Sequence, residues 1–287
     1  GGGDGGGSSD GGGDSSGPDL SQYLITDING NPPSLDPHAI DSTANTAWGV
    51  FPMNAYEPLL FYEPSESTLQ PVLAEEVPTV DNGLITNDNR TFEFPLRQGV
   101  QFHTGGEMTS EDVKYSIDRV RTMNLTGGSG LDRIESIETP DDSTVRLNLP
   151  DGANPKIIKI HLNNLYLHTK HSEFEQYLDG VGDYADETVA DELLSKEIKE
   201  PVTNGPFGEP QYNQQRLLLS RQDNYFKSEN ITFDEYEMRY IQGNQQVWQE
   251  LLGNSIDAVW SVFTPPRIVA DFPNSIIESA IPAYWGY

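Results

Sequence analysis

The sequence predicts a folded α/β protein. One observation indicates the class, and two others indicate that the chain folds around a core. Apolar strands alternate with a helix near the end of the chain, at residues 217–220, 236–241 and 245–252. Strands that alternate with helices are typical of a sheet covered by helices. Aromatic residues make up 10% of the chain, more than a disordered polymer would carry. At 287 residues, the chain is long enough to bury a large core.

The first third of the chain is expected to open with a strand at residues 21–28, followed by a turn-rich segment. A helix is expected at residues 44–54, and one or two helical turns at 71–76. Strands are expected at 76–80 and 91–96, joined by a polar turn that contains Asp81, Asn82 and Gly83.

The clearest helical pattern lies at residues 110–121. Thr109 is a capping residue and Asp112 follows three positions later. Three apolar residues then fall on one helical face: Val113, Ile117 and Val120. Alternating apolar residues at 145–149 predict a half-buried strand, paired with residues 133–138 across a turn at 140–143. Further helices are expected at 155–167, 188–199 and 265–270, and further strands at 258–260 and 275–279.

The composition is strongly acidic, with 17 Lys and Arg against 45 Asp and Glu, for a formal charge of −28. No basic cluster is available to neutralise phosphates, so nucleic acid is not an expected partner. Scattered acids favour a surface adapted to high salt, where screening removes self-repulsion. A merely acidic protein from an ordinary environment is the alternative. The chain has no cysteine, which excludes disulfides and thiolate sites.

A longer pattern of residues resembles a known family. Ala74-Glu75-Glu76 precedes LRQGVQFH at residues 96–103, and TSEDVKYS follows at 109–116. This order resembles the signature region of family 5 extracellular solute-binding proteins, the peptide- and nickel-binding components of ABC transporters. Supporting matches are PSLDP at 33–37, YEPL at 56–59, NGPF at 204–207, RQDNYF at 221–226 and DAVW at 257–260.

The resemblance implies a periplasmic-binding-protein-like fold of type II, a two-lobed clamshell. It divides the sequence into a flexible Gly/Ser/Asp tether at 1–20, a first lobe at 21–280 and a hinge or crossover at 281–287. The second lobe is then missing from this sequence. Residues 1–19 hold 10 of the 27 glycines and no apolar side chain. Such a tether suggests a lipoprotein anchored to the outer face of the cell membrane, with an engineered linker as the alternative.

The function implied by the resemblance is capture of a solute without chemistry, by a monomer that delivers it to ABC permease subunits. A di- or oligopeptide is the expected solute, and no cofactor is expected. A nickel complex or an oligosaccharide is the alternative within the family. A surface-anchored structural or adhesion protein is another alternative, and a secreted hydrolase is a third. No hydrolase or phosphate-binding motif is present to support catalysis.

Binding residues are expected on loops at strand ends, where open α/β sheets place ligands. The candidate loops are residues 31–36, 54–57 and 260–264. The expected ligand-binding residues are Asn54, Tyr56, Glu57, Trp260 and Phe263. Tyr56 and Trp260 are equally compatible with a place in the core.

The signature region itself is expected to be scaffold. Gly99 is expected to adopt a backbone conformation closed to other residues, and Val100 and Phe102 are expected to be buried. His103 is expected to be a hydrogen-bonding structural residue. No metal site is expected at His161, His168 and His171, because Lys170 would oppose a cation. The acidic loop at 179–186 lacks the alternating ligands of a calcium loop.

Overall fold

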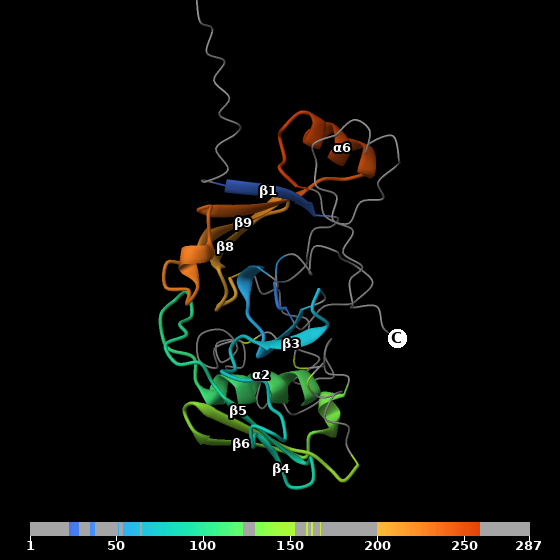
Figure 1. Cartoon of the computed structure of the whole chain (residues 1–287). Helices are drawn as coiled ribbons and strands as arrows, with labels where there is room; N and C mark the ends of the chain where they lie inside the picture. The colour runs from blue at the N-terminus through green and yellow to red at the C-terminus, as the bar shows by residue number, and fades with distance from the viewer. Residues whose placement is uncertain are drawn as a thin grey trace, which may run out of the picture.

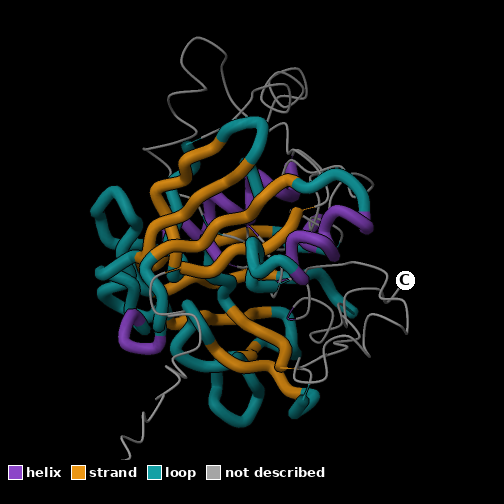
Figure 2. The backbone as a smooth tube through the Cα atoms, turned by 90° about the horizontal axis from the view of Figure 1, so that it is seen from above, coloured by secondary structure: helices purple, strands orange, loops and turns teal. Residues whose placement is uncertain are grey.

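The computed structural model describes residues 23–28, 35–37, 51, 54–63, 65–122, 130–152, 159, 162, 167 and 200–258. Within them the strands are β1 (Tyr23–Ile28), β2 (Leu60–Glu63), β3 (Thr68–Pro71), β4 (Ile85–Thr86), β5 (Thr91–Pro95), β6 (Ser136–Asp141), β7 (Thr144–Asn148), β8 (Phe207–Tyr212), β9 (Arg216–Arg221) and β10 (Glu235–Tyr240). The α-helices are α2 (Ser110–Thr122) and α6 (Asn244–Leu252), with 3-10 turns η1 (Leu131–Arg133) and η3 (Ser228–Asn230). In the view from above, strands fill the middle of this part of the chain and loops surround them (Figure 2).

The upper sheet in Figure 1 has the strand order β1-β10-β9-β8. The first strand of the chain lies parallel to β10, and the other pairs are antiparallel. One face of the sheet is apolar because Leu217 and Leu219 on β9 share it with Tyr236 and Met238 on β10. These side chains form the core of what we call the upper unit, together with Leu35, Phe51, Ala55, Tyr56 and Phe207.

The lower sheet has the order β4-β5-β7-β6, all antiparallel. Helix α2 lies along the sheet, on its upper side in Figure 1. The inward residues of β5 and β7 alternate with polar ones, and Phe92, Phe94, Val145 and Leu147 are all 0% exposed. They pack with Val113, Ile117 and Val120 of α2 in one cluster, so the expected helical face is confirmed. Sheet and helix together form the lower unit.

A small hairpin, β2 and β3, lies between the two larger sheets in Figure 1. It was not expected from the sequence. Two other local predictions are wrong. Residues 71–76 are not helical, because Ala74 pairs with Leu96 as an isolated bridge. Residues 76–80 form no strand, and the partner of β5 on that side is β4.

Most other expectations on the described residues hold. The expected strands at 21–28, 91–96, 217–220 and 236–241 correspond to β1, β5, β9 and β10, and the hairpin across residues 140–143 is β6 and β7. Helix α2 begins where expected, and the amide of Thr109 donates to Asp112 Oδ2 at 2.9 Å. The helices expected at 188–199 and 265–270 and the strand at 275–279 lie outside the described residues, as do most of the helices expected at 44–54 and 155–167 and of the strand expected at 258–260. Among the described helices, none has the length and apolarity that crossing a membrane requires.

Candidate functional site

In the part of the chain that the structure describes, two segments pass between the two units, and these two crossovers are the centre of the candidate site. In the first crossover, Tyr56 belongs to the upper core and Leu59 to the lower core. In the second, Val202 belongs to the lower core and Phe207 to the upper core. Residues 56–59 and 202–207 therefore connect the units in opposite directions.

The two crossovers touch each other directly. The amide of Gly205 donates to the carbonyl of Ala55 at 2.8 Å. The amide of Glu57 donates to Asn204 Oδ1 at 3.0 Å. A Cβ on Gly205 would lie 2.6 Å from the carbonyl carbon of Ala55, a contact that real side chains do not make. Glycine at position 205 is therefore what lets the two backbones approach.

Tyr225, in the loop after β9, holds the first crossover from the side. Its hydroxyl donates to Glu57 Oε1, and its ring lies 4.7 Å from the ring of Phe226. Burial raises the pKa of Glu57, and the hydrogen bond from Tyr225 opposes that rise. Burial also raises the pKa of Tyr225, and the neighbouring Glu57 carboxylate adds to the rise. The hydroxyl therefore stays a donor, and the carboxylate of Glu57 is its acceptor.

His103, at the end of the signature region, holds the second crossover. The amide of His103 donates to the carbonyl of Thr203, and the amide of Thr203 donates to His103 Nδ1, both at 2.9 Å. Burial lowers the pKa of His103, and the nearby Glu209 carboxylate opposes this effect. The imidazole thus acts as a neutral acceptor, and the expectation of a hydrogen-bonding structural residue is confirmed.

Further contacts of the signature region join the same two units. Asn224 Nδ2 donates to the carbonyl of Phe102 at 3.1 Å. The guanidinium of Arg97 lies 4.9 Å from the ring of Phe226. We call the paired crossovers, with His103, Asn224 and Tyr225, the joint. It brings together the residues of the family-like motifs at 56–59, 96–103, 204–207 and 221–226.

A buried ion pair joins the loop after β1 to α2. Arg119 donates to both carboxylate oxygens of Asp36, with Nη1 at 3.0 Å from Oδ1. Both side chains are 1% exposed. Asp36 lies in the PSLDP motif, so this candidate binding loop is fixed at its end to the lower unit.

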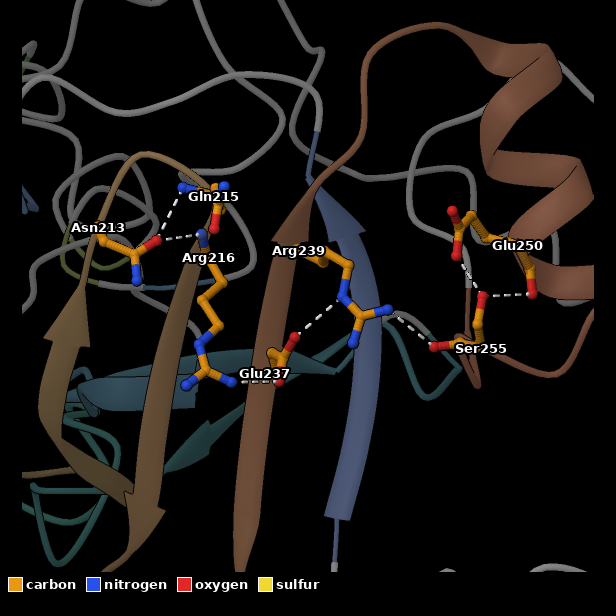
Figure 3. Close-up of polar contacts among 7 residues, drawn as sticks. All are labelled: Asn213, Gln215, Arg216, Glu237, Arg239, Glu250 and Ser255. Carbon is orange, nitrogen blue, oxygen red and sulfur yellow. Dashed lines mark hydrogen bonds and ion pairs between the residues drawn. The ribbon is translucent and has the colours of Figure 1, made fainter.

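A second polar cluster lies on the face of the upper sheet opposite its core (Figure 3). Glu237 is 2% exposed and alternates along β10 with the core residues Tyr236 and Met238. Its carboxylate accepts from Arg216 at 3.1 Å and from Arg239 at 2.9 Å. Arg239 also donates to the carbonyl of Ser255 at 3.1 Å. The cluster therefore fixes the turn after α6, from which the chain leads to the candidate loop at 260–264.

The structure places three of the five expected binding residues. Asn54 is half-buried in a helical segment with Ala55. Tyr56 is 1% exposed, and its ring meets that of Phe51 edge-on at a centroid distance of 5.8 Å. Tyr56 thus lies in the core, the alternative that the sequence left open.

Glu57, the third of these residues, is engaged by the joint. Trp260 and Phe263 lie outside the described residues, as do His161, His168, His171 and the acidic loop at 179–186. In the part of the chain that the structure describes, no three His, Asp or Glu side chains gather as a metal site would require.

Sequence reasoning assigned no role to Asn204 and Tyr225, although both lie in motifs that it singled out. Their membership in these motifs could have indicated a role, because motifs far apart in a chain often meet in space.

A surface hollow of about 390 Å³ lies where the amino-terminal end of α2 meets the lower sheet. Its lining includes Arg97 beside Glu107 and Asp141. None of the three expected binding residues that the structure describes, Asn54, Tyr56 and Glu57, lines it.

A mixed upper sheet with a parallel first strand, and a lower unit inserted between paired crossovers, define one lobe of a type II periplasmic binding protein. The comparisons with known proteins agree. The sequence profile of bacterial extracellular solute-binding proteins, family 5, matches residues 68–280. The chain therefore belongs to this family of solute-binding proteins.

Similar proteins share the fold at low sequence identity. The dipeptide-binding protein of Escherichia coli is 24% identical over 226 residues, which cover 72% of this chain and 38% of the relative. The oligopeptide-binding protein AppA of Bacillus subtilis is 28% identical over 162 residues, covering 54% of this chain and 26% of the relative.

Among solved structures, AppA in complex with a nonapeptide gives a TM-score of 0.64 at 22% identity, covering 83% of this chain and 43% of that chain. NikZ from Campylobacter jejuni, in complex with Ni(L-His), gives 0.67 at 17% identity, covering 89% and 45%. The chain thus spans less than half the length of these relatives.

Proposed function

We propose that this chain is part of an extracellular receptor that captures a di- or oligopeptide and delivers it to an ABC importer. The observation that carries the proposal is the family match over residues 68–280, joined to two curated relatives named for dipeptides and oligopeptides. Lobes of this class close on a solute as a hinge does, and the closed form is what a membrane permease would recognise.

The proposed solute wall consists of the three candidate segments, residues 31–36, 54–57 and 260–264. Asn54 and the expected residues Trp260 and Phe263 are the candidate contacts, with Asp36 fixing the end of the loop after β1. Tyr56 and Glu57 support this wall from within, because one lies in the core and the other is bound by Tyr225. A peptide backbone would be met by fixed polar groups, as small-molecule sites generally provide.

A nickel complex is the second candidate solute, favoured by the structural likeness to NikZ with bound Ni(L-His). We also propose that the protein acts as a monomer at high salt. The composition of residues 1–19 supports a tether to the outer face of the cell membrane. Loss of transport in favour of a structural or adhesive role is the remaining alternative.

Native mass spectrometry and calorimetry of the full-length protein test the function. Alanine di-, tri- and pentapeptides and Ni(L-His) complexes are suitable probes. We expect a peptide to bind, and Asn54→Ala to weaken it about tenfold, as loss of one good polar contact would. Glu135→Gln, an exposed change just before β6 in the lower unit, is the matched control and should leave affinity unchanged. Binding of the nickel complex alone would reassign the solute, and no binding of any probe would favour the non-transport alternative.

A further inference from the structure

Three hydrogen bonds from distant parts of the chain hold segment 54–57. Within this short segment, one carbonyl, one amide and one carboxylate each meet a partner from a distant part of the chain. The carbonyl of Ala55 accepts from Gly205, the amide of Glu57 donates to Asn204, and its carboxylate accepts from Tyr225.

We propose that Asn204 and Tyr225 are positioning residues, which fix segment 54–57 and so set the solute wall that it continues. The value of this positioning for solute binding rests on the proposed function. The positioning itself does not.

Asn204 is a buried polar residue of the joint that forms a hydrogen bond through only one end of its side-chain amide. The side chain is 2% exposed, and its Oδ1 accepts the Glu57 amide. Its Nδ2 atom is buried without a hydrogen-bond partner. An unpaired buried donor is unfavourable, and an apolar residue would avoid it. Asparagine is therefore best explained by the acceptor that it places against Glu57, next to the glycine that allows the crossovers to touch.

Tyr225 acts on the same segment from the loop after β9. Its side chain is 8% exposed, and the ring packs beside Phe226, which itself lies against Arg97 of the lower unit. The ring thus belongs to the packing of the joint, and the hydroxyl forms the hydrogen bond to the first crossover. Removing the hydroxyl alone separates positioning from packing, because phenylalanine keeps the ring.

Hydrogen exchange at single amides tests the positioning directly. In Tyr225→Phe, the amide of Glu57 should exchange about tenfold faster, as loss of a hydrogen bond to a charged group implies. Amides in the middle of α2 should keep their wild-type rates. Glu57→Gln retains an acceptor for the Tyr225 hydroxyl, so its position-57 amide should stay within about twofold of wild type. Asn204→Ala should release the same amide directly.

Tyr240→Phe is the matched control, because Tyr240 is a half-buried tyrosine of the upper unit whose hydroxyl makes no described hydrogen bond. It should leave exchange at Glu57 unchanged. An unchanged Glu57 amide in Tyr225→Phe would overturn the proposal, and so would equal acceleration throughout both units, which indicates global destabilisation only. If Asn204→Ala does not fold, Tyr225→Phe still decides.

Calorimetry with the alanine peptides separates this inference from the proposed function. If the wild type binds a peptide, Tyr225→Phe should weaken it severalfold while Tyr240→Phe does not. If the wild type binds no peptide, the proposed function fails, and the exchange rates alone decide whether Asn204 and Tyr225 position the segment.

Discussion

At the scale of single residues, the sequence predicted the burial and the turn conformation of the signature region, but not the residues that it contacts. Gly99 has a φ of 74°, and Val100 and Phe102 are each 1% exposed, as expected. These properties are local, because a turn glycine and apolar neighbours show them in the sequence. The partner of His103 is Thr203, one hundred residues away, and no local pattern contains that information.

Protonation of His103 should weaken the joint, because Nδ1 accepts from the Thr203 amide. The pKa of His103 is lowered in the folded protein from the ordinary value of 6.5, so below that pH the unfolded chain binds more protons. The contribution of His103 is therefore complete above pH 6.5 and declines as the pH falls, with a slope of at most ~1.4 kcal/mol per pH unit. Urea unfolding between about pH 5.5 and 7.5 measures it.

His103→Asn is the control for this pH dependence. The asparagine Oδ1 takes the place of Nδ1 as an acceptor but does not titrate. As the pH falls, the free energy of unfolding should decrease more in the wild type than in the variant. The general effect of charge on an acidic protein is common to both, so this difference isolates the histidine. Parallel curves for the two proteins would contradict the assignment.

Breaking the Asp36–Arg119 pair should lower the free energy of unfolding strongly, whereas replacing both residues by apolar ones should lower it little. Asp36→Asn removes the carboxylate charge that Asp36 places against the 1% exposed guanidinium, at a cost of about 3–5 kcal/mol. The double variant Asp36→Leu with Arg119→Met removes both charges and should recover most of this loss. Denaturant titrations of the single and double variants give the coupling free energy. Additive losses would show that the two side chains act independently.

At the scale of elements, strands such as β1 and β10 were located although their partners are distant, and helix α2 was predicted well because its hydrogen bonds are local. Helix α2 satisfies its own backbone and carries its own cap at Thr109 and Asp112. Residues 71–76 also look helical in sequence, but their amides donate elsewhere. Leu73 donates to the carbonyl of Pro58, Ala74 to Leu59 and Glu75 to Pro95. Tertiary pairing overrides local preference here, and it is equally why the β2–β3 hairpin and the joint were not expected.

Gly205→Ala should drive the two crossovers apart. The added Cβ would lie within 2.7 Å of three backbone atoms of Ala55 and Tyr56, which cannot rotate aside. Overpacking of this kind costs about 1–3 kcal/mol, and the upper end is expected against backbone. Exchange at Glu57 should also accelerate. Gly83→Ala is the comparison, because its φ of 78° is strained for alanine but no atom lies within 4 Å. A smaller loss at 205 than at 83 would contradict the close-approach argument.

At the scale of the whole molecule, alternating strands and helices in the sequence predicted the fold class. The order of the motifs along the chain indicated the family. The candidate site followed only in part. The structure places Asn54 and Glu57 in one segment, whereas the contacts that hold this segment come from residues almost 150 and 170 positions away. Such contacts depend on topology, which a single sequence does not specify.

The excess of acid should make stability depend on salt. Cationic side chains of the described part already serve ion pairs, among them Arg90, Lys114, Arg119, Arg146, Arg216, Arg221 and Arg239. With a formal charge of −28, most carboxylates therefore repel one another at low ionic strength. Screening shortens the Debye length to roughly 3 Å at 1 M salt and removes this repulsion.

We expect the melting temperature to rise by at least ~10 °C between low and multimolar KCl, equivalent to about 3–5 kcal/mol for a chain of this size. A variant that replaces three exposed acids by amides, Glu75→Gln, Glu135→Gln and Glu235→Gln, should melt at higher temperature than wild type in low salt and show a flatter salt curve. Sucrose at matched osmolality stabilises by exclusion and does not screen charge, so it should not reproduce the difference between the two proteins. A wild-type melting temperature that stays flat across the KCl series would refute the adaptation to high salt, and the acidity would then serve solubility alone.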